Sequence, residues 1–304
     1  MAEICSCETI MGNTGVPTCY SALKLGKGIF MTPTFANDGT KNVIHTTDTL
    51  NDAYFTALIN NSDPSKRLYP LQKLNAVASE RADPTYDTRS DGGNAFVKDG
   101  IRSYSFEIWE GGARLKKELD KGRCREFSFY IFNEGQLIGM DLTDEQLELA
   151  PIRIAKDSLV VSYMFPDDSK VEKINVKFQF NQSENDGNLS FVEVESDVEL
   201  TGYRGLLDIY STVSNISATG FKVKLKNKYG PANVVSADSG LIVTDFALYN
   251  LTNKAAVTIS AVTEVSDGEY DFTIPSTVGK TLRLTPTKTG RDYKAVVSNT
   301  FTTP

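Results

Sequence analysis

The chain has 304 residues, of which 40% are hydrophobic and 23% are charged, so it has enough apolar side chains to build folded cores. This composition excludes a collagen-like protein and a wholly disordered one. A formal charge of −7 disfavours a nucleic-acid binder that works by neutralising many phosphates. No stretch approaches the roughly 18 consecutive apolar residues of a membrane-spanning helix. The opening residues lack the basic and apolar segments of a signal peptide, so we expect neither a membrane span nor Sec export.

Three cysteines near the start form the pattern C-x-C-x11-C (Cys5, Cys7 and Cys19), and a fourth, Cys124, is distant. A structural zinc site completed by Cys124 or His45 would normally use two C-x2–4-C pairs, and only one atypical pair is present. A disulfide would need an oxidising compartment, and no export is expected. We therefore interpret these cysteines as reduced thiols and predict no metal and no other cofactor.

Residues 25–102 are rich in Asn, Asp, Pro and Gly and are only sparsely periodic. We expect a long irregular arm with one short helix, capped by Asp48, whose apolar stripe is Leu50, Tyr54 and Leu58. Loops this long are uncommon in a compact domain unless they are functional or pack against another chain. Two interpretations stay open: an irregular surface excursion, or an arm that reaches a neighbouring subunit with Arg67, Tyr69 and Tyr86 at its rim.

Three later segments alternate apolar with polar or small residues, which predicts half-buried strands. Their apolar positions are Tyr104, Phe106 and Ile108; Phe127, Phe129 and Ile131; and Ile174, Val176, Phe178 and Phe180. Short helices are expected over residues 113–121 and from a capping box at residues 143–146. The turn Asn185-Asp-Gly187 predicts a hairpin that returns into residues 189–195. A first domain of residues 1–198 is therefore predicted to be α+β and mostly antiparallel.

The composition changes near residue 197. Residues 197–304 carry 11 Lys/Arg and 10 Asp/Glu, whereas the first 196 residues carry 21 and 29. Short Thr/Val/Ser-rich runs between turn signals predict a second domain over residues 199–304, an immunoglobulin-like (Ig-like) β-sandwich without the Cys…Trp…Cys signature. A lysine stripe (Lys222, Lys224, Lys226 and Lys228) alternates with apolar residues, and we interpret it as an edge strand protected against aggregation. The predicted fold class is thus mainly β with a few short helices.

The sequence lacks the motifs of serine hydrolases, zinc proteases, P-loop NTPases and dinucleotide-binding enzymes. Its single histidine, His45, has no supporting motif and is interpreted as structural or surface-exposed. We interpret the carboxylate pairs Asp167/Asp168 and Glu193/Glu195 as solvated faces. The run NQSENDGN (residues 181–188) has the wrong spacing for an EF-hand. We predict no catalytic residues and no enzymatic activity.

Three segments combine strands, turns and a helix in a characteristic order. The first domain contains DGIRSYSFEIWEGGARLKKELDKGR (residues 99–123) and FSFYIFNEGQLIGM (residues 127–140). The second contains DFALYNLTNKAAVTISAVTEVSDGEYDFTI (residues 245–274), with Tyr270 one residue short of a tyrosine-corner spacing. On these segments the chain resembles structural proteins of tailed bacteriophages: tail-tube subunits in the first domain, and the Ig-like modules of phage tail and head proteins in the second.

The resemblance implies a virion protein, assembled in the host cytoplasm, whose copies form stacked six-fold rings around a DNA channel. The three amphipathic strands would be the assembly strands of a tail-tube-like β-sandwich or barrel, residues 25–102 would contact the next ring, and the Ig-like domain would lie outside. Expected partners are further copies of the chain, other virion proteins, and DNA that passes without specific binding because the first domain is acidic.

Two other functions stay open at this stage. One is a capsid-associated or head–tail connecting virion protein, which would also carry an Ig-like module. The other is a carbohydrate-binding or glycan-cleaving protein that uses Trp109, Tyr104 and the Glu193/Glu195 pair, because sugars are commonly held on aromatic rings. A structural subunit is expected to form rings or tubes, whereas a glycan-binding protein is expected to stay monomeric and bind sugar.

Overall fold

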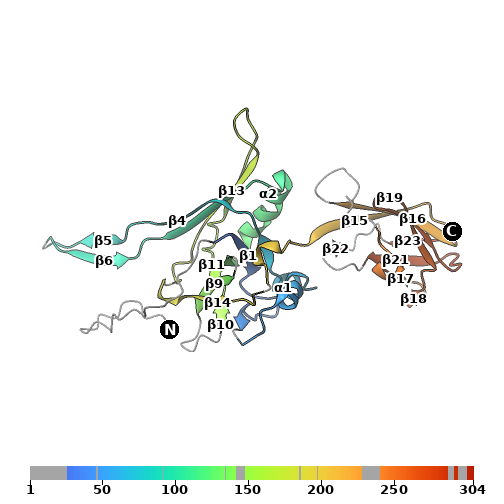
Figure 1. The fold of residues 1–304 in the computed structure, drawn as a ribbon, viewed down its shortest axis with the longest axis horizontal. Coiled ribbons are helices and arrows are strands. Elements are labelled where there is room, and N and C mark those ends of the chain that lie inside the picture. The colour runs from blue at the N-terminus through green and yellow to red at the C-terminus, as the bar shows by residue number, and fades with distance from the viewer. Residues whose placement is uncertain are drawn as a thin grey trace. The chain divides into compact units, whose positions relative to one another are not determined.

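The computed structural model describes residues 26–45, 47–90, 92–133, 135–141, 148–184, 186–196, 198–227, 240–286, 291–293 and 300–304. The chain divides into two compact units, Met1–Gly205 and Leu206–Pro304. Strands predominate in both, which confirms the prediction of a mainly β fold (Figure 1). Within the described ranges, every helix is too short or too polar to span a lipid bilayer. Cys5, Cys7, Cys19 and the capping box at residues 143–146 lie outside those ranges.

The first unit contains two packed sheets. One has eight strands: β1 (Gly28–Pro33), β2 (Ile44–His45), β3 (Tyr69–Leu71), β8 (Phe127–Phe132), β9 (Gln136–Asp141), β10 (Glu148–Ala150), β11 (Ile152–Arg153) and β14 (Leu189–Glu193). Its main path runs β2-β10-β9-β8-β1-β3, with β11 on β8 and β14 on β9. The other has four: β4 (Asn75–Arg81), β7 (Arg102–Ile108), β12 (Val160–Met164) and β13 (Lys173–Gln179), in the order β12-β13-β7-β4.

Apolar side chains from both sheets form the main core between them. Ile29, Met31 and Phe129 of the larger sheet meet Phe106 and Phe178 of the smaller one, and the rings of Phe129 and Phe178 lie 4.7 Å apart. The four-stranded sheet is amphipathic as predicted: β13 buries every second residue. The first unit is therefore a β-sandwich.

The eight-stranded sheet is buried on its second face as well. Phe30 of β1 and Tyr130 and Phe132 of β8 point away from the main core and pack against α1 (Asp52–Ile59). The buried Tyr130 hydroxyl donates to the carbonyl oxygens of Asn42 and Leu149, so the phenol keeps its hydrogen bonds. The prediction of a half-exposed strand over residues 127–131 is wrong, because α1 covers the face that would otherwise meet solvent.

Helix α1 begins after Asn51, whose side-chain oxygen accepts the backbone N–H of Tyr54 at 2.9 Å. The cap is thus Asn51 rather than the predicted Asp48, and Phe55 and Ile59 are the buried residues of the helix. The predicted stripe is shifted by one residue because the buried face is set by the aromatic cluster of β1 and β8.

The second helix, α2, covers Gly112–Asp120, one residue from the prediction, and continues into the 3-10 turn η2 (Lys121–Cys124).

The predicted hairpin between β13 and residues 189–195 is wrong. Strand β13 pairs with β7 and β12, whereas β14 pairs with β9 in the other sheet. The connection contains a 3-10 turn, η3 (Asp186–Asn188), and crosses from one sheet to the other. A turn motif reports a local reversal of the chain, but the partner of the next strand depends on tertiary packing.

Residues 25–102 are not one irregular arm. They supply β1, which lies inside the eight-stranded sheet and is buried throughout, together with α1, β3 and β4. Only β5 (Thr85–Thr88) and β6 (Asn94–Lys98) leave the sandwich, as a two-stranded hairpin that extends the β4–β7 pair outward (Figure 1). Strand β1 is short and buried on both faces, so its residues do not alternate between apolar and polar. Because that alternation is the mark of a half-buried strand, the sequence-based prediction missed β1.

The second unit is a separate β-sandwich with its own core. Its five-stranded sheet has the order β19-β20-β16-β15-β22, and the four-stranded sheet has the order β18-β17-β21-β23. The strands are β15 (Leu207–Ser214), β16 (Gly220–Asn227), β17 (Phe246–Asn250), β18 (Ala255–Val257), β19 (Ala261–Ser266), β20 (Glu269–Thr273), β21 (Thr281–Pro286), β22 (Arg291–Tyr293) and β23 (Thr300–Thr302). The residues between the predicted boundary and Leu206 belong to the first unit, where Leu200 is fully buried.

The lysine stripe is not on an edge strand. Strand β16 lies between β15 and β20, and Lys222 and Lys224 lie 3.5 and 3.6 Å from Asp271 and Glu269 of β20. Lys222 and Lys224 therefore form cross-strand ion pairs on the solvent face of an interior strand, which corrects the prediction of edge protection, and Lys228 lies outside the described residues. The buried Tyr270 donates its hydroxyl to the Glu264 carboxylate at 3.3 Å, within the β19–β20 hairpin.

We expect Phe178→Ala to lower the free energy of unfolding by about 3–5 kcal/mol, because it removes a fully buried ring from the core between the sheets. The matched control is Lys177→Ala on the solvent face of the same strand, where a change within about 0.5 kcal/mol is expected. Urea unfolding followed by tryptophan fluorescence measures both. Equal losses for the two variants would contradict this description of the core.

A fragment of residues 199–304 is expected to fold alone, because the second unit has a closed core of its own. Circular dichroism with thermal unfolding is expected to show strand structure and a cooperative transition. A fragment that stays unfolded while the whole chain folds would show that this unit depends on the first.

Candidate assembly surfaces

The ten predicted assembly residues come together in one place, the core between the two sheets. Eight are buried there, and Phe127 and Ile131 are partly buried against them. The eight are Tyr104, Phe106, Ile108, Phe129, Ile174, Val176, Phe178 and Phe180. Burial raises the pKa of Tyr104 to about 12. These side chains hold the two sheets of one chain together, so contact with another copy would have to use the strand edges and not these side chains.

The four-stranded sheet of the first unit has an edge strand on each side, β12 and β4. Among the described strands, β12 pairs only with β13, and β4 pairs only with β7. Val160 and Met164 of β12 are 49% and 38% exposed, so the edge strand also presents apolar side chains. Open edges offer unpaired backbone N–H and C=O groups to another strand. Sequence analysis missed β12, although the run Val160-Val-Ser-Tyr-Met164 has strand-forming residues that could have revealed it.

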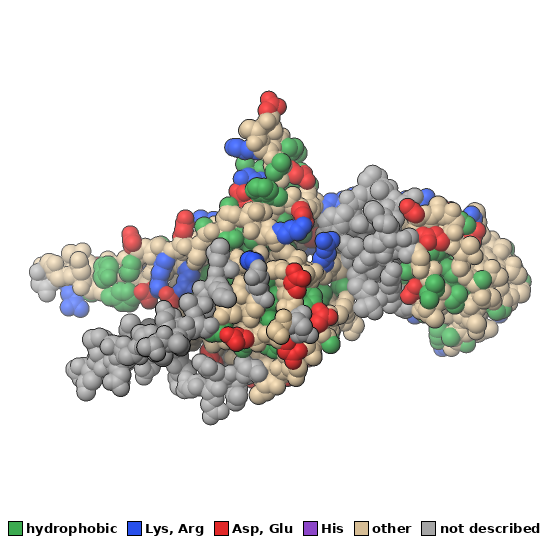
Figure 2. Space-filling model, in the orientation of Figure 1, with side chains coloured by type: hydrophobic (Ala, Val, Ile, Leu, Met, Phe, Trp, Pro, Cys, Tyr) green, Lys and Arg blue, Asp and Glu red, His purple; other side chains and the backbone are tan. Residues whose placement is uncertain are grey.

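The β5–β6 hairpin is the second candidate surface. Tyr86 and Phe96 face each other across its two strands with ring centroids 6.0 Å apart, and both are more than half exposed. Val97 is also exposed, and Figure 2 shows hydrophobic side chains gathered on this hairpin. An isolated two-stranded hairpin is marginally stable in water. Of the three rim residues predicted for an arm, Tyr86 lies here, Arg67 is buried against the turn after α1, where it donates to the Asn61 carbonyl, and Tyr69 lies on β3.

The base of the hairpin carries two arginines that face each other. Arg81 of β4 pairs in register with Arg102 of β7, which would be repulsive on its own. Asp186 of η3 binds both guanidinium groups, and its carboxylate lies 2.7 Å from Arg81. Burial, and then the charge of Arg81, lower the pKa of Arg102, whose guanidinium also lies over the Phe180 ring. A second carboxylate, Asp99, lies 3.5 Å from Arg81, and Asp186 is the one that binds both arginines where the hairpin leaves the sandwich.

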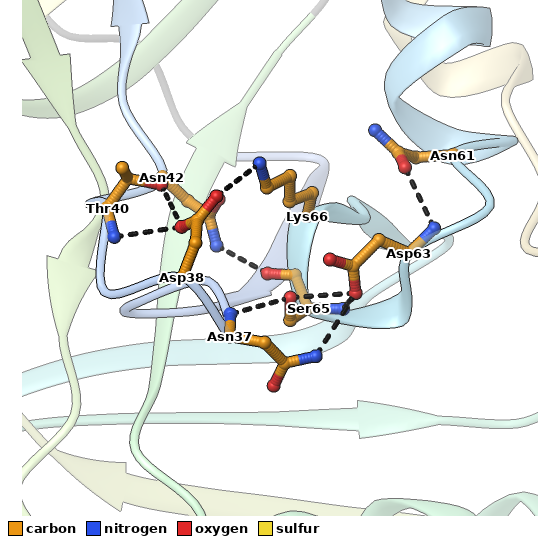
Figure 3. Close-up of polar contacts among 8 residues, drawn as sticks. All are labelled: Asn37, Asp38, Thr40, Asn42, Asn61, Asp63, Ser65 and Lys66. Carbon is orange, nitrogen blue, oxygen red and sulfur yellow. Dashed lines mark hydrogen bonds and ion pairs between the residues drawn. The ribbon is translucent and has the colours of Figure 1, made fainter.

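A polar cluster joins the β1–β2 loop to the turn after α1 (Figure 3). Asp38 accepts hydrogen bonds from Thr40 and forms a 2.6 Å ion pair with Lys66, and this contact holds the pKa of the Asp38 carboxyl well below its usual range. Asp63 accepts from Ser65, whose hydroxyl oxygen accepts the backbone N–H of Asn37. The carboxylates of Asp38 and Asp63 are thus hydrogen-bonded or ion-paired to nearby donors, and these contacts link the β1–β2 loop to the turn after α1.

The residues proposed for carbohydrate binding are not brought together as an aromatic platform. Tyr104 is buried in the core and has no ring face open to a sugar. Trp109 is 52% exposed and donates its indole N–H to Glu107 at 3.2 Å. The Lys173 ammonium, 2.5 Å from Glu107, lowers the pKa of that carboxyl. Glu193 is in the other sheet, on β14.

The other chemistry-bearing residues are also engaged in surface contacts. His45 lies 3.7 Å from Glu148 on the neighbouring strand β10. In the run of residues 181–188, Glu184 pairs with Arg153 and Asp186 with the two arginines of the hairpin base. The described residues contain no cluster of three or more His, Cys, Asp or Glu arranged to hold a metal ion. Asp167 binds Ser169 within a turn, which lowers the pKa of its carboxyl.

Comparison with known proteins gives no relative for this chain. No protein-family model matches it, and neither a curated protein nor a solved structure is significantly similar.

We expect Asp186→Asn to loosen the hairpin base, because the amide cannot offset the repulsion between the two facing arginines. Hydrogen exchange of the amides in residues 82–101 is expected to become faster, with little change in the sandwich core. Asp168→Asn, which alters an exposed carboxylate elsewhere in the same unit, is the matched control. Unchanged exchange in Asp186→Asn would show that the ion pairs do not hold the hairpin.

Proposed function

We propose that this protein is a self-assembling structural subunit in which β12 of one copy pairs with β4 of the next. The observation that carries the proposal is the four-stranded antiparallel sheet with an open edge on each side. Joining edges between copies satisfies the backbone groups that a single copy leaves unpaired. The assembly that the resemblance to tail-tube subunits favours is a ring around a DNA channel in a tailed-bacteriophage virion.

Strand direction supports pairing between these two edges. All three pairings within the sheet are antiparallel, so β12 and β4 at its opposite edges run in opposite directions. Copies related by rotation therefore place β4 of one copy antiparallel to β12 of its neighbour, and the alternation continues from copy to copy. Such a heterologous contact closes into a ring when the rotation divides a full turn. Six copies per ring is the number that the resemblance implies.

The charge on the sheet bears on the proposed channel. The solvent face of the four-stranded sheet carries Glu80 and Glu107 together with Lys173 and Lys177. A channel lined by this face would be close to neutral, so DNA would pass because the wall offers it few net charges. A near-neutral wall differs from the expectation of a negatively lined channel.

The β5–β6 hairpin suits contacts beyond a single ring. It continues the β4–β7 pair past the end of the sheet and exposes Tyr86, Phe96 and Val97. Burial of these side chains against another copy would stabilise a hairpin that is marginal alone. The second unit has its own core and is not needed for the pairing of β12 with β4, so removing it is expected to leave assembly intact.

The double variant Val160→Lys/Ser162→Lys is expected to abolish assembly without unfolding the chain, because both residues are exposed on the edge strand and edge lysines oppose pairing. Val278→Lys, at an exposed apolar site in the second unit, is the matched control and is expected to assemble like the parent chain. Sedimentation velocity and negative-stain electron microscopy over a range of protein concentration and salt measure the outcome.

Disulfide trapping tests which edges meet. In a chain with its native cysteines replaced by serine, Val160→Cys is expected to link to a cysteine placed along β4, such as Ala78→Cys, in a second copy. Links between two Val160→Cys residues would indicate a two-fold dimer instead. A parent chain that stays monomeric at every concentration would refute the proposal and favour the connecting-protein or glycan-binding alternatives.

A further inference from the structure

The connection between β12 and β13 projects from the first unit as a short, well-formed turn (Figure 1). Asp167 and Lys170 pair across it, and the Asp167 carboxylate accepts both the N–H and the hydroxyl of Ser169. Phe165, at its base, is 80% exposed, and its ring contacts Tyr163 edge-on at 5.1 Å. Figure 2 shows hydrophobic side chains on this projection below an acidic apex. The Phe165 side chain is thus exposed to solvent at the base of a turn that is held by its own hydrogen bonds.

A groove lies at the start of the other edge strand, β4. It has a volume of about 520 Å³ and is lined by Gly26, Lys27, Lys73, Leu74, Asn75, Ala76, Val77 and Thr201. Lys73 and Ala76 have positive φ angles of 53° and 47°, and the β4–β7 register is irregular between Asn75 and Ala78. The backbone therefore turns away from a regular strand here, which leaves room beside the edge.

The sheet register places the projection and the groove at the same end of the sheet. Met164 pairs with Lys173 of β13, and the next residue of that strand, Ile174, pairs with Ile108 of β7. Glu107 of β7 pairs with Asn75, the first residue of β4. Ser162 of β12 is thus level with Asn75, and the residues after Met164 extend past the start of β4, so antiparallel pairing of β12 with β4 of a neighbouring copy brings the projection to the end where the groove lies.

We propose that Phe165 of one copy docks into the β4 groove of the next copy. The proposal rests on the edge pairing proposed above and adds a side-chain contact that fixes its register. Leu74 and Val77 supply apolar walls, and the groove is large enough for a phenyl ring. The acidic apex with Asp167 and Asp168 would lie at the end of the sheet that carries Lys73, which pairs with Glu110 at 2.6 Å. Burial of the ring is the main contribution, and the charges favour the same orientation.

Photo-crosslinking of the full chain tests this contact. With Phe165→p-benzoylphenylalanine, irradiation of the assembled protein is expected to give a covalent dimer, and mass spectrometry is expected to locate the link within residues 26–27 or 73–77 of a second copy. The same photoreactive residue at Val278 is the control and is expected to give no link to these residues. Links to any other surface, or links within one chain only, would overturn the proposal.

A second measurement separates this contact from the edge pairing itself. Phe165→Ser is expected to raise the protein concentration needed for half-maximal assembly about tenfold, since a buried aromatic anchor is lost while the backbone edges remain. The edge variant Val160→Lys/Ser162→Lys is expected to abolish assembly altogether. Assembly of Phe165→Ser at the parent's concentration would overturn the groove contact and leave the edge pairing standing. Failure of the parent chain to assemble would remove both.

Discussion

Burial of the eight-stranded sheet on both faces is the constraint on which the rest of the first unit depends. Strand β1 has no residue open to solvent, so its two neighbours and both covering layers must be in place for it to be stable. The four-stranded sheet covers one face and α1 the other. The smaller sheet is held by the larger sheet and by α2, which packs against β12 and β13, and assembly is proposed from its outer face and its edge strands β12 and β4.

The elements with a solvent face were the ones that the sequence predicted well. The strand over Ile174–Phe180 and the helix near residues 113–121 appear where expected. One side of each meets water, so polar and apolar residues recur at the spacing typical of that element. Strand β1 and β8 are buried on both faces and therefore show no such spacing. The pairing of β14 with β9 was also beyond reach, because local turn chemistry does not specify which strand receives the returning chain.

The candidate surfaces were less predictable than the fold. Periodicity identified Phe106 and Phe178, whose role is in the core, whereas the edges depend on strand order, a property of the folded sheet. The exposed pair Tyr86 and Phe96 lies in a stretch whose composition resembles a loop, so only its position in the structure shows it to be a hairpin. The sequence places Asp186 in a turn motif and in the polar run of residues 181–188, and its contact with two facing arginines depends on the register of β4 and β7.

The two projections of the first unit leave the four-stranded sheet at opposite ends. The β5–β6 hairpin extends from the end at Arg81, and the turn bearing Phe165 extends from the end at Met164. A polymer whose copies keep their strands aligned inherits this polarity, so its two terminal faces differ in shape and chemistry. Growth rates at the two ends need not be equal, and a protein that caps one end would have no matching surface at the other. Directional elongation would then be a property of the subunit itself, without an external template to set the direction.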